Sequence, residues 1–236
     1  MNFHMLHIAQ FRYSSDNLAY LIYGEEEAIA VDGGAVEEIE QFLEENQLTL
    51  QHVINTHSHY DHTSGNDYLL KRHKARSLSC YQLSSHGHLL LENDTINVLL
   101  TPGHTEDSLC FQVRQFLLTG DTLFNGTIGN CFSGRGDLFY QSIKDIMTLS
   151  RETIIYAGHD YVRDSIIFAR KLEPENGHLD RFMAGYDADH VYSTLADEFQ
   201  INPYLRFNDE KMIAIMKQLG FSGTTEWDRW SFLMSL

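Results

Sequence analysis

Apolar residues occur in short runs along the first two thirds of the chain, and each run ends at a small or polar residue. Residues 18–23 and 28–31 form two such runs, separated by Gly24 and closed by Asp32 and two glycines. Runs of about 4–8 residues that are rich in Val, Ile and Leu and bounded by turn residues are typical of buried strands. The pattern predicts strands over these runs and over residues 52–55, 95–100, 108–113, 116–118 and 153–156.

Two parts of the chain show the period of a helix instead. Residues 36–48 place apolar side chains on one helical face and glutamates on the other, which predicts an amphipathic helix. The same period dominates from Asp164 to the end of the chain. Because a strand-rich part precedes a helical part, we expect an α/β domain over residues 1–163 and a helical domain over residues 164–236. The C-terminal helices are predicted over residues 165–172, from residue 193, and over residues 209–219.

The composition is that of a globular protein with a large core: 236 residues, 43% of them hydrophobic and 21% charged. The chain carries 17 basic and 33 acidic side chains, which gives a formal net charge of −16. Lys and Arg supply most of the affinity of proteins for polyanions. The charge therefore argues against nucleic acid and anionic membranes as partners.

The compartment can also be inferred from the sequence. No apolar run approaches the about 20 residues of a membrane span, and residues 1–12 lack the pattern of a signal peptide. The 3 cysteines do not suggest a framework of disulfides. We expect a cytoplasmic protein that is a monomer or a small homo-oligomer.

The 13 histidines are the unusual feature of the composition, and several of them directly follow predicted strands. The densest group, His57 to His62, follows the run at residues 52–55. A lone histidine there would most often be structural, but four ligand-type side chains within six positions would be costly to bury without a metal. Layered α/β proteins build their sites at strand ends. Further ligand-type side chains follow other predicted strands: His104, Asp121 and His159.

Taken together, five imidazoles and two carboxylates indicate a site for two metal ions. One Zn²⁺ takes about four protein ligands, whereas two metals that share one carboxylate would use all seven. His57 and His59 can point the same way from an extended loop, while Asp61 and His62 lie past a bend and reach a second metal. Two cations about 3.5–4 Å apart would hold a water between them and supply hydroxide near neutral pH. We expect two divalent ions per chain, with Zn²⁺ first and iron or Mn²⁺ as alternatives.

The order of these residues resembles the metallo-β-lactamase superfamily, and within it the hydroxyacylglutathione hydrolase (glyoxalase II) family. The segments 56–62, 101–105, 120–124 and 158–161 resemble successive family motifs, and residues 193–206 resemble the family's helical substrate domain. The resemblance implies an αββα metallo-β-lactamase sandwich followed by a small C-terminal α-helical domain. It also implies a first metal on His57, His59 and His104, a second on Asp61, His62 and His159, and Asp121 as the bridge.

The family resemblance implies an enzyme, a metal-dependent hydrolase of small-molecule thioesters. Its expected substrate is S-(2-hydroxyacyl)glutathione, which would yield glutathione and a 2-hydroxy acid. A metal-bridging hydroxide would attack the thioester carbonyl, whose oxygen gains charge that a metal stabilises. The leaving thiolate has a pKa of about 8.5, so its departure needs little help from an acid.

The substrate pocket departs from the family pattern more than the metal site does. Asp137 stands where the family has a basic residue, and Phe232 stands where it has a lysine. A carboxylate at residue 137 would repel the glycyl carboxylate of glutathione. The resemblance places four side chains at the substrate: Tyr161, Arg135, Phe139 and Arg229.

Two other functions use the same scaffold and stay open at this point. Persulfide dioxygenases resemble this site but hold one iron, on His57, His104 and Asp121, and they lack the helical domain suggested by residues 193–206. A metal-binding protein with a drifted pocket would keep the ligands without catalysis. Asp32 also has two interpretations: it supports a ligand histidine or is an ordinary turn aspartate.

Overall fold

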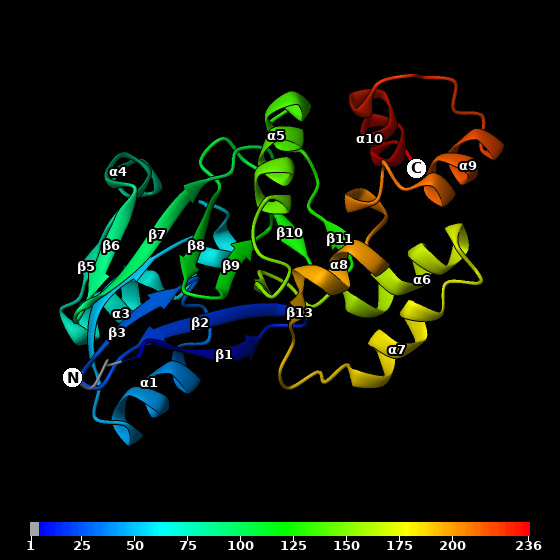
Figure 1. The fold of residues 1–236 in the computed structure, drawn as a ribbon. Helices are drawn as coiled ribbons and strands as arrows, with labels where there is room; N and C mark the ends of the chain where they lie inside the picture. Colours follow the sequence, from blue (N-terminus) through cyan, green and yellow to red (C-terminus); the bar gives the residue numbers. More distant parts are fainter. Residues whose placement is uncertain (1–4) are drawn as a thin grey trace.

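The computed structural model describes residues 5–236, and two β-sheets packed face to face form its larger part (Figure 1). Within these residues, one sheet has five strands in the order β1-β2-β3-β4-β5: β1 (His7–Tyr13), β2 (Asn17–Tyr23), β3 (Glu27–Val31), β4 (Thr49–Ile54) and β5 (Arg76–Ser77). The second sheet, in the order β13-β12-β9-β8-β7-β6, consists of β6 (His88–Leu91), β7 (Asp94–Leu100), β8 (Leu109–Val113), β9 (Phe116–Gly120), β12 (Ile154–Ala157) and β13 (Ser193–Thr194). A short hairpin is formed by β10 (Leu123–Phe124) and β11 (Thr127–Ile128).

Strands β2 and β3 of the first sheet are buried on both faces, which explains their continuous apolar runs. Side chains alternate between the two faces of a strand. In β2, Leu18, Tyr20 and Ile22 point into the core between the sheets, whereas Ala19 and Leu21 pack on the outer face. A strand covered on both sides has no face for water, so its sequence shows no polar alternation.

Helices cover the outer faces of both sheets. In chain order they are α1 (Val36–Glu45), α2 (Tyr60–Thr63), α3 (Asn66–His73), α4 (Cys80–His86) and α5 (Gly136–Met147). Ile39 of α1 and Leu69 of α3 pack on the first sheet, and Phe139 and Ile143 of α5 pack in the cluster that covers the second. The layers are therefore helix, sheet, sheet and helix, as the family resemblance implies.

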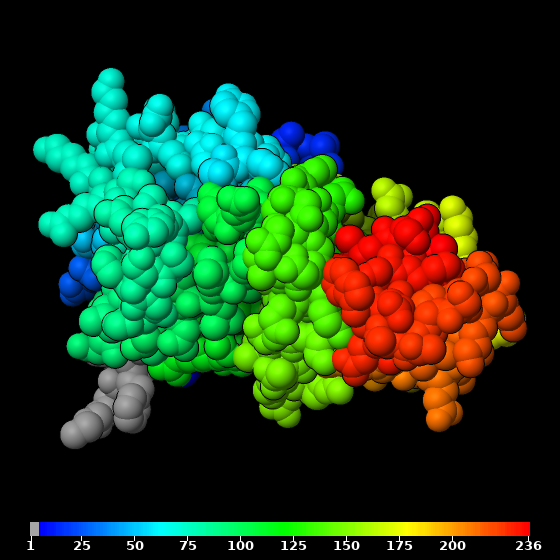
Figure 2. Space-filling view, turned by 90° about the horizontal axis from the view of Figure 1, so that it is seen from above, coloured from blue at the N-terminus to red at the C-terminus, as the bar shows by residue number. Residues whose placement is uncertain are grey.

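The C-terminal part is helical and lies at one end of the molecule, shown in yellow, orange and red in Figure 2. It contains α6 (Val162–Leu172), α7 (Gly177–Gly185), α8 (Leu195–Ile201), the 3-10 helix η1 (Pro203–Leu205), α9 (Glu210–Gln218) and α10 (Glu226–Met234). Val162 and Ile166 of α6 belong to the core between the sheets, so this part packs closely against the sandwich. No helix within residues 5–236 has both the length and the apolar character needed to cross a bilayer.

The C-terminal part also contributes a strand to the second sheet. The sequence predicts the start of a helix at residue 193, but Ser193 and Thr194 form β13 and pair with β12. The helix starts at Leu195, and the Thr194 side chain accepts a hydrogen bond from the backbone of Asp197. Thr194 suits both roles, because its branched side chain fits a strand and its hydroxyl caps the helix. The domain boundary near residue 163 falls in the first turn of α6 and stays a prediction.

Candidate metal centre

Sheet topology brings the predicted ligands together. Strands β7 and β9 both pair antiparallel with β8, and β9 pairs parallel with β12. β7, β9 and β12 therefore run in the same direction, and the loops that follow them lie at one edge of the second sheet. The loop after β4 and the short helix α2 bring the remaining ligands from the other sheet. The side chains that meet are His57, His59, Asp61, His62, His104, Asp121 and His159.

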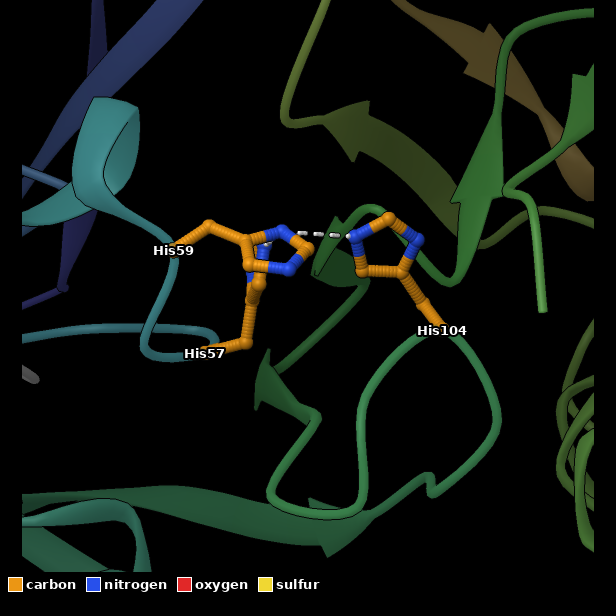
Figure 3. A group of neighbouring side chains, drawn as sticks. All are labelled: His57, His59 and His104. Carbon is orange, nitrogen blue, oxygen red and sulfur yellow. Dashed lines mark hydrogen bonds between the residues drawn. The ribbon is translucent and has the colours of Figure 1, made fainter. Parts of the chain in front are cut away.

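Three of the histidines point toward one another (Figure 3). His57 Nε2 lies 2.9 Å from His59 Nδ1, which lies 3.1 Å from His104 Nε2. Two nitrogens bound to one tetrahedral Zn²⁺ are separated by ~3.3 Å, given bonds of about 2.0–2.1 Å. The three ring nitrogens are therefore close to the spacing that a single cation requires.

A second group lies beside the first. His62 Nε2 is 3.2 Å from His159 Nε2, and His159 Nε2 is 3.3 Å from Asp61 Oδ2. Asp121 lies between the groups, because Oδ1 is 3.3 Å from His62 Nε2 and Oδ2 is 3.5 Å from His104 Nε2. A carboxylate in this position can contact cations held by either group.

Hydrogen bonds on the outer ring nitrogens determine which nitrogen of each histidine carries a proton. His62 Nδ1 lies 3.0 Å from Asp32 Oδ2, so in the neutral ring that metal binding requires, Nδ1 donates to this carboxylate and Nε2 keeps a lone pair. His57 Nδ1 lies 3.1 Å from Thr56 Oγ1, whose own proton is donated to Asp32. The other two pairs are His104 Nδ1 with the carbonyl of Asn130 at 3.0 Å and His159 Nδ1 with Asp16 Oδ1 at 2.8 Å.

When the histidines are neutral, as metal binding requires, the inner atoms of the site are acceptors that face one another. Asp121 is largely buried, and its Oδ1 accepts no hydrogen bond from the residues that the structure describes. Buried acceptors without donors are costly, and a cation between them removes that cost. The donor set of imidazoles and carboxylates suits divalent metals. The residues therefore fit a metal, and the site is a divalent metal-binding site.

The charges around His62 favour a positive charge at the same place. Burial lowers the pKa of His62, but the carboxylates of Asp32 and Asp121 outweigh it and raise the pKa to about 11. Burial would raise the pKa of Asp121, yet the neighbouring imidazoles, His62 above all, lower it to about 2. Burial lowers the pKa of His57 to about 4, so its ring is neutral at pH 7. A metal bound here would displace a proton from His62, so metal binding should strengthen as pH rises.

Most of the residues that orient the ligands could not be recognised from the sequence. Both interpretations of Asp32 apply. It is a turn aspartate with φ 52° after β3, and it supports the ligands by accepting hydrogen bonds from His62 and Thr56. Asp16 and Asn17 lie at the turn between β1 and β2, and Asn17 donates to Asp61 at 3.0 Å. No local motif marks these two residues, because they meet the site only through the pairing of distant strands.

Comparison with known proteins places this geometry in a family. The family model of the metallo-beta-lactamase superfamily matches residues 15–94, and that of the hydroxyacylglutathione hydrolase C-terminus matches residues 160–233. The hydroxyacylglutathione hydrolase of Idiomarina loihiensis is 33% identical over 204 residues, which cover 80% of this chain and 81% of that protein. The chain belongs to the hydroxyacylglutathione hydrolase family.

Further members of the hydroxyacylglutathione hydrolase family and one solved structure extend the likeness. Hydroxyacylglutathione hydrolase 1 of Vibrio vulnificus is 32% identical over 208 residues, covering 82% of this chain and 84% of that protein. The crystal structure of ETHE1 from Myxococcus xanthus superimposes with a TM-score of 0.66 at 26% identity, covering 96% of this chain and 99% of that one. The fold of this chain therefore matches that of a solved structure over nearly the full length of both.

Among the side chains that the hydroxyacylglutathione hydrolase resemblance places at the substrate, Tyr161 lies nearest the metal ligands. Its ring stacks on His159 with centroids 5.1 Å apart and an interplanar angle of 5°. Phe124 contacts both rings edge-on. Burial raises the pKa of Tyr161 to about 12, so its phenol is a neutral hydrogen-bond donor at pH 7.

Arg135 lies on the surface and is already paired. Its Nε and Nη2 donate to the two carboxylate oxygens of Asp137 at 2.9 and 2.8 Å. More than half of each side chain is exposed, 54% and 60% respectively. The carboxylate at the position where hydroxyacylglutathione hydrolases have a basic residue therefore neutralises the nearest cation.

The structure places Phe139 and Arg229 against other side chains of the protein, and their contact with the substrate stays a prediction. Phe139 is fully buried, and its ring packs against that of Trp230. Arg229 donates to Asn208 Oδ1 at 2.6 Å and to the carbonyl of Thr224, which ties α10 to the turn before α9. Both side chains stabilise the packing of the C-terminal helices in this structure.

Proposed function

We propose that this protein hydrolyses S-(2-hydroxyacyl)glutathione thioesters to glutathione and a 2-hydroxy acid with the help of two divalent metals. The observation that carries the proposal is the pair of adjacent donor groups with Asp121 between them. Membership of the hydroxyacylglutathione hydrolase family supports the substrate class, a small-molecule thioester.

We assign each donor group to one metal. His57, His59 and His104 would hold the first ion, and the other group of three would hold the second, with Asp121 shared. The second group comprises Asp61, His62 and His159. Zn²⁺ is the expected metal, with iron or Mn²⁺ as alternatives. Two such ions would lower the pKa of a water molecule and polarise a thioester carbonyl.

Two hollows flank the site and offer room for the two halves of a thioester. One, of about 340 Å³, is lined by Tyr161, Phe124 and other aromatic side chains. The other, of about 450 Å³, is lined by Phe132 and the tryptophans of α10, and the Phe132 ring lies 5.2 Å from that of His104. Asn130 lines both hollows, and its carbonyl holds His104. We propose that the thioester lies across Asn130, with its acyl group and its thiol carrier on opposite sides.

A panel of thioesters assayed on metal-analysed protein tests the function. We expect hydrolysis of S-D-lactoylglutathione at a higher kcat/KM than of the coenzyme A analogue, with two metals per chain. Exhaustive chelation should abolish the activity, and added Zn²⁺ or Mn²⁺ should restore it. Activity that survives chelation, or a fully loaded protein that hydrolyses no thioester, would reject the proposal. Oxygen consumption with glutathione persulfide and one iron per chain would favour the dioxygenase.

The pairing of Arg135 with Asp137 leads to a prediction about glutathione. Replacing Asp137 with lysine should free Arg135 and reverse the local charge, lowering KM for the glutathione thioester. Exposed charge interactions are worth ~0.2–1 kcal/mol, so the expected decrease is up to about fivefold. KM for an uncharged thioester of mercaptoethanol should not change.

Asp145, exposed at the other end of α5, offers a matched control. Asp145→Lys changes the net charge by the same amount. Because residue 145 lies farther along α5, this substitution should leave KM for the glutathione thioester unchanged. High salt should remove the effect of Asp137→Lys, because ions screen exposed charges. An unchanged or increased KM in Asp137→Lys would argue that glutathione does not bind near this turn.

We also propose that the protein works in the cytoplasm. A relative from Saccharomyces cerevisiae, 29% identical over 226 residues, is named the cytoplasmic isozyme of hydroxyacylglutathione hydrolase. Fractionation of the source cells would test the location. The prediction of a monomer or small homo-oligomer stays open to sedimentation analysis.

A further inference from the structure

A short hairpin segment packs against the ligands of the metal centre. Residues 121–130 contain β10 and β11 and begin at Asp121, the ligand between the two donor groups. Phe124 lies 5.9 Å from the ring of His159, and the carbonyl of Asn130 accepts a hydrogen bond from His104 Nδ1 at 3.0 Å. The segment therefore contains one proposed ligand and contacts two others, so its position affects both donor groups.

The tip of this hairpin is held by the C-terminal part of the chain. The backbone N–H of Gly126 donates to both oxygens of Glu198, at 3.0 and 3.1 Å. The amide of Asn202 donates to the carbonyl of Thr127 at 3.0 Å and also to Glu198 at 2.8 Å. Glu198, on α8, and Asn202, the residue that follows α8, thus hold Gly126 in the turn and Thr127 at its exit.

The surroundings of Glu198 are matched to a carboxylate. The side chain is fully buried, and its hydrogen-bond partners within residues 5–236 are all donors. The Ser193 hydroxyl lies 2.7 Å away and itself accepts from the Asn125 amide, so its proton points at Glu198. A glutamine here would direct an N–H₂ group at one of these donors and leave it unpaired.

We propose that Glu198 is a positioning residue for the metal centre, which acts through the hairpin of residues 121–130. By fixing Gly126, it holds the Asn130 carbonyl against His104 and the Phe124 ring against His159. Glu198 touches neither the ligands nor the substrate. The inference rests on the proposed metal assignment, but it predicts a metal affinity that can be measured without any thioester.

The test is the metal affinity of Glu198→Gln, measured by competition with a chromophoric chelator at pH 8. Burial raises the pKa of Glu198 to about 7, so at pH 8 the wild-type side chain is a carboxylate. Substitution of a residue that contacts a metal ligand directly weakens metal binding by about 10–100-fold. Because Glu198 acts through the hairpin, we expect Glu198→Gln to weaken metal binding by roughly 3–10-fold. We also expect a lower kcat with added metal at an unchanged KM, and an altered visible spectrum of the Co²⁺-substituted protein.

Glu173→Gln provides a matched control. Glu173 is another buried glutamate of the C-terminal part, and within residues 5–236 its side chain bonds Arg206 and Asn176 rather than the hairpin. Its substitution should lower the melting temperature but leave metal affinity and the Co²⁺ spectrum as in wild type. Should Glu198→Gln fail to fold, Ser193→Ala removes one donor to the same carboxylate and should weaken metal binding in the same direction.

A Glu198→Gln protein that folds, melts at lower temperature and binds metal as wild type does would overturn the proposal. In that case Glu198 would only stabilise the contact between α8 and the sandwich. With Ser193→Ala, wild-type affinity would count in the same way. Loss of metal affinity together with absence of thioester hydrolysis in the wild type would support the positioning role and reject the proposed function.

Discussion

Replacing Asp121 with alanine is expected to lower kcat/KM for the glutathione thioester by at least about 10³-fold, or ~4 kcal/mol of transition-state stabilisation. Asp121 is the one predicted ligand that lies between the two donor groups, 3.3 Å from His62 and 3.5 Å from His104. Without it, the proposed metals lose their shared ligand, and the second donor group keeps only one carboxylate. Steady-state kinetics and metal analysis of the purified variant would measure the effect.

The Asp121→Ala chain should remain folded, because the substitution removes a buried charge and leaves the strands around it intact. Circular dichroism and the melting temperature of the metal-free protein would verify this. Asp94→Ala is a suitable control, since it removes an aspartate paired with Arg114 on the surface and should not affect turnover. Retention of most of the activity by Asp121→Ala would refute its bridging role.

Asp32→Asn is expected to weaken metal binding by about 10–100-fold, the range found when residues that orient metal ligands are changed. Asp32 is almost fully buried and accepts hydrogen bonds from His62 directly and from the Thr56 hydroxyl, which in turn contacts His57. One carboxylate therefore orients a ligand of each donor group. An asparagine amide would present a donor where the site requires an acceptor, and chelator competition would measure the loss.

Asparagine is the informative substitution because residue 32 has φ 52°, a conformation that Asp and Asn tolerate about equally. Backbone strain therefore does not contribute to the difference in metal affinity between wild type and Asp32→Asn. Asp16→Asn is the matched comparison: its carboxylate accepts from His159 and from the exposed Ser15 hydroxyl. It therefore orients a single proposed ligand and is about one third exposed, so a smaller loss is expected. Equal metal affinity in wild type and Asp32→Asn would contradict the orienting role.

The regular elements could be predicted where burial is complete on both sides. Strands such as β2 and β9 appear as unbroken apolar runs, because both of their faces lie in cores. The edge strands β1 and β6 were missed. Most side chains of β1 are only half-buried and include Gln10 and Arg12, and those of β6 alternate between exposed and buried. Helix α10 was also missed, although Thr225 and Asp228 form a capping box that marks its start.

The sequence by itself determined the candidate ligands, because seven imidazole and carboxylate side chains at strand ends have few other uses. It did not determine what surrounds them. Asp16, Asn130 and Glu198 act only after β-sheet pairing and helix packing bring segments more than 20 residues away into contact with the ligand loops. The burial of Phe139 and the pairing of Arg135 likewise depend on how α5 and α10 pack. Ligand identity is a local chemical property, whereas orientation, burial and hydrogen bonding depend on distant parts of the chain, and only the tertiary structure decided them.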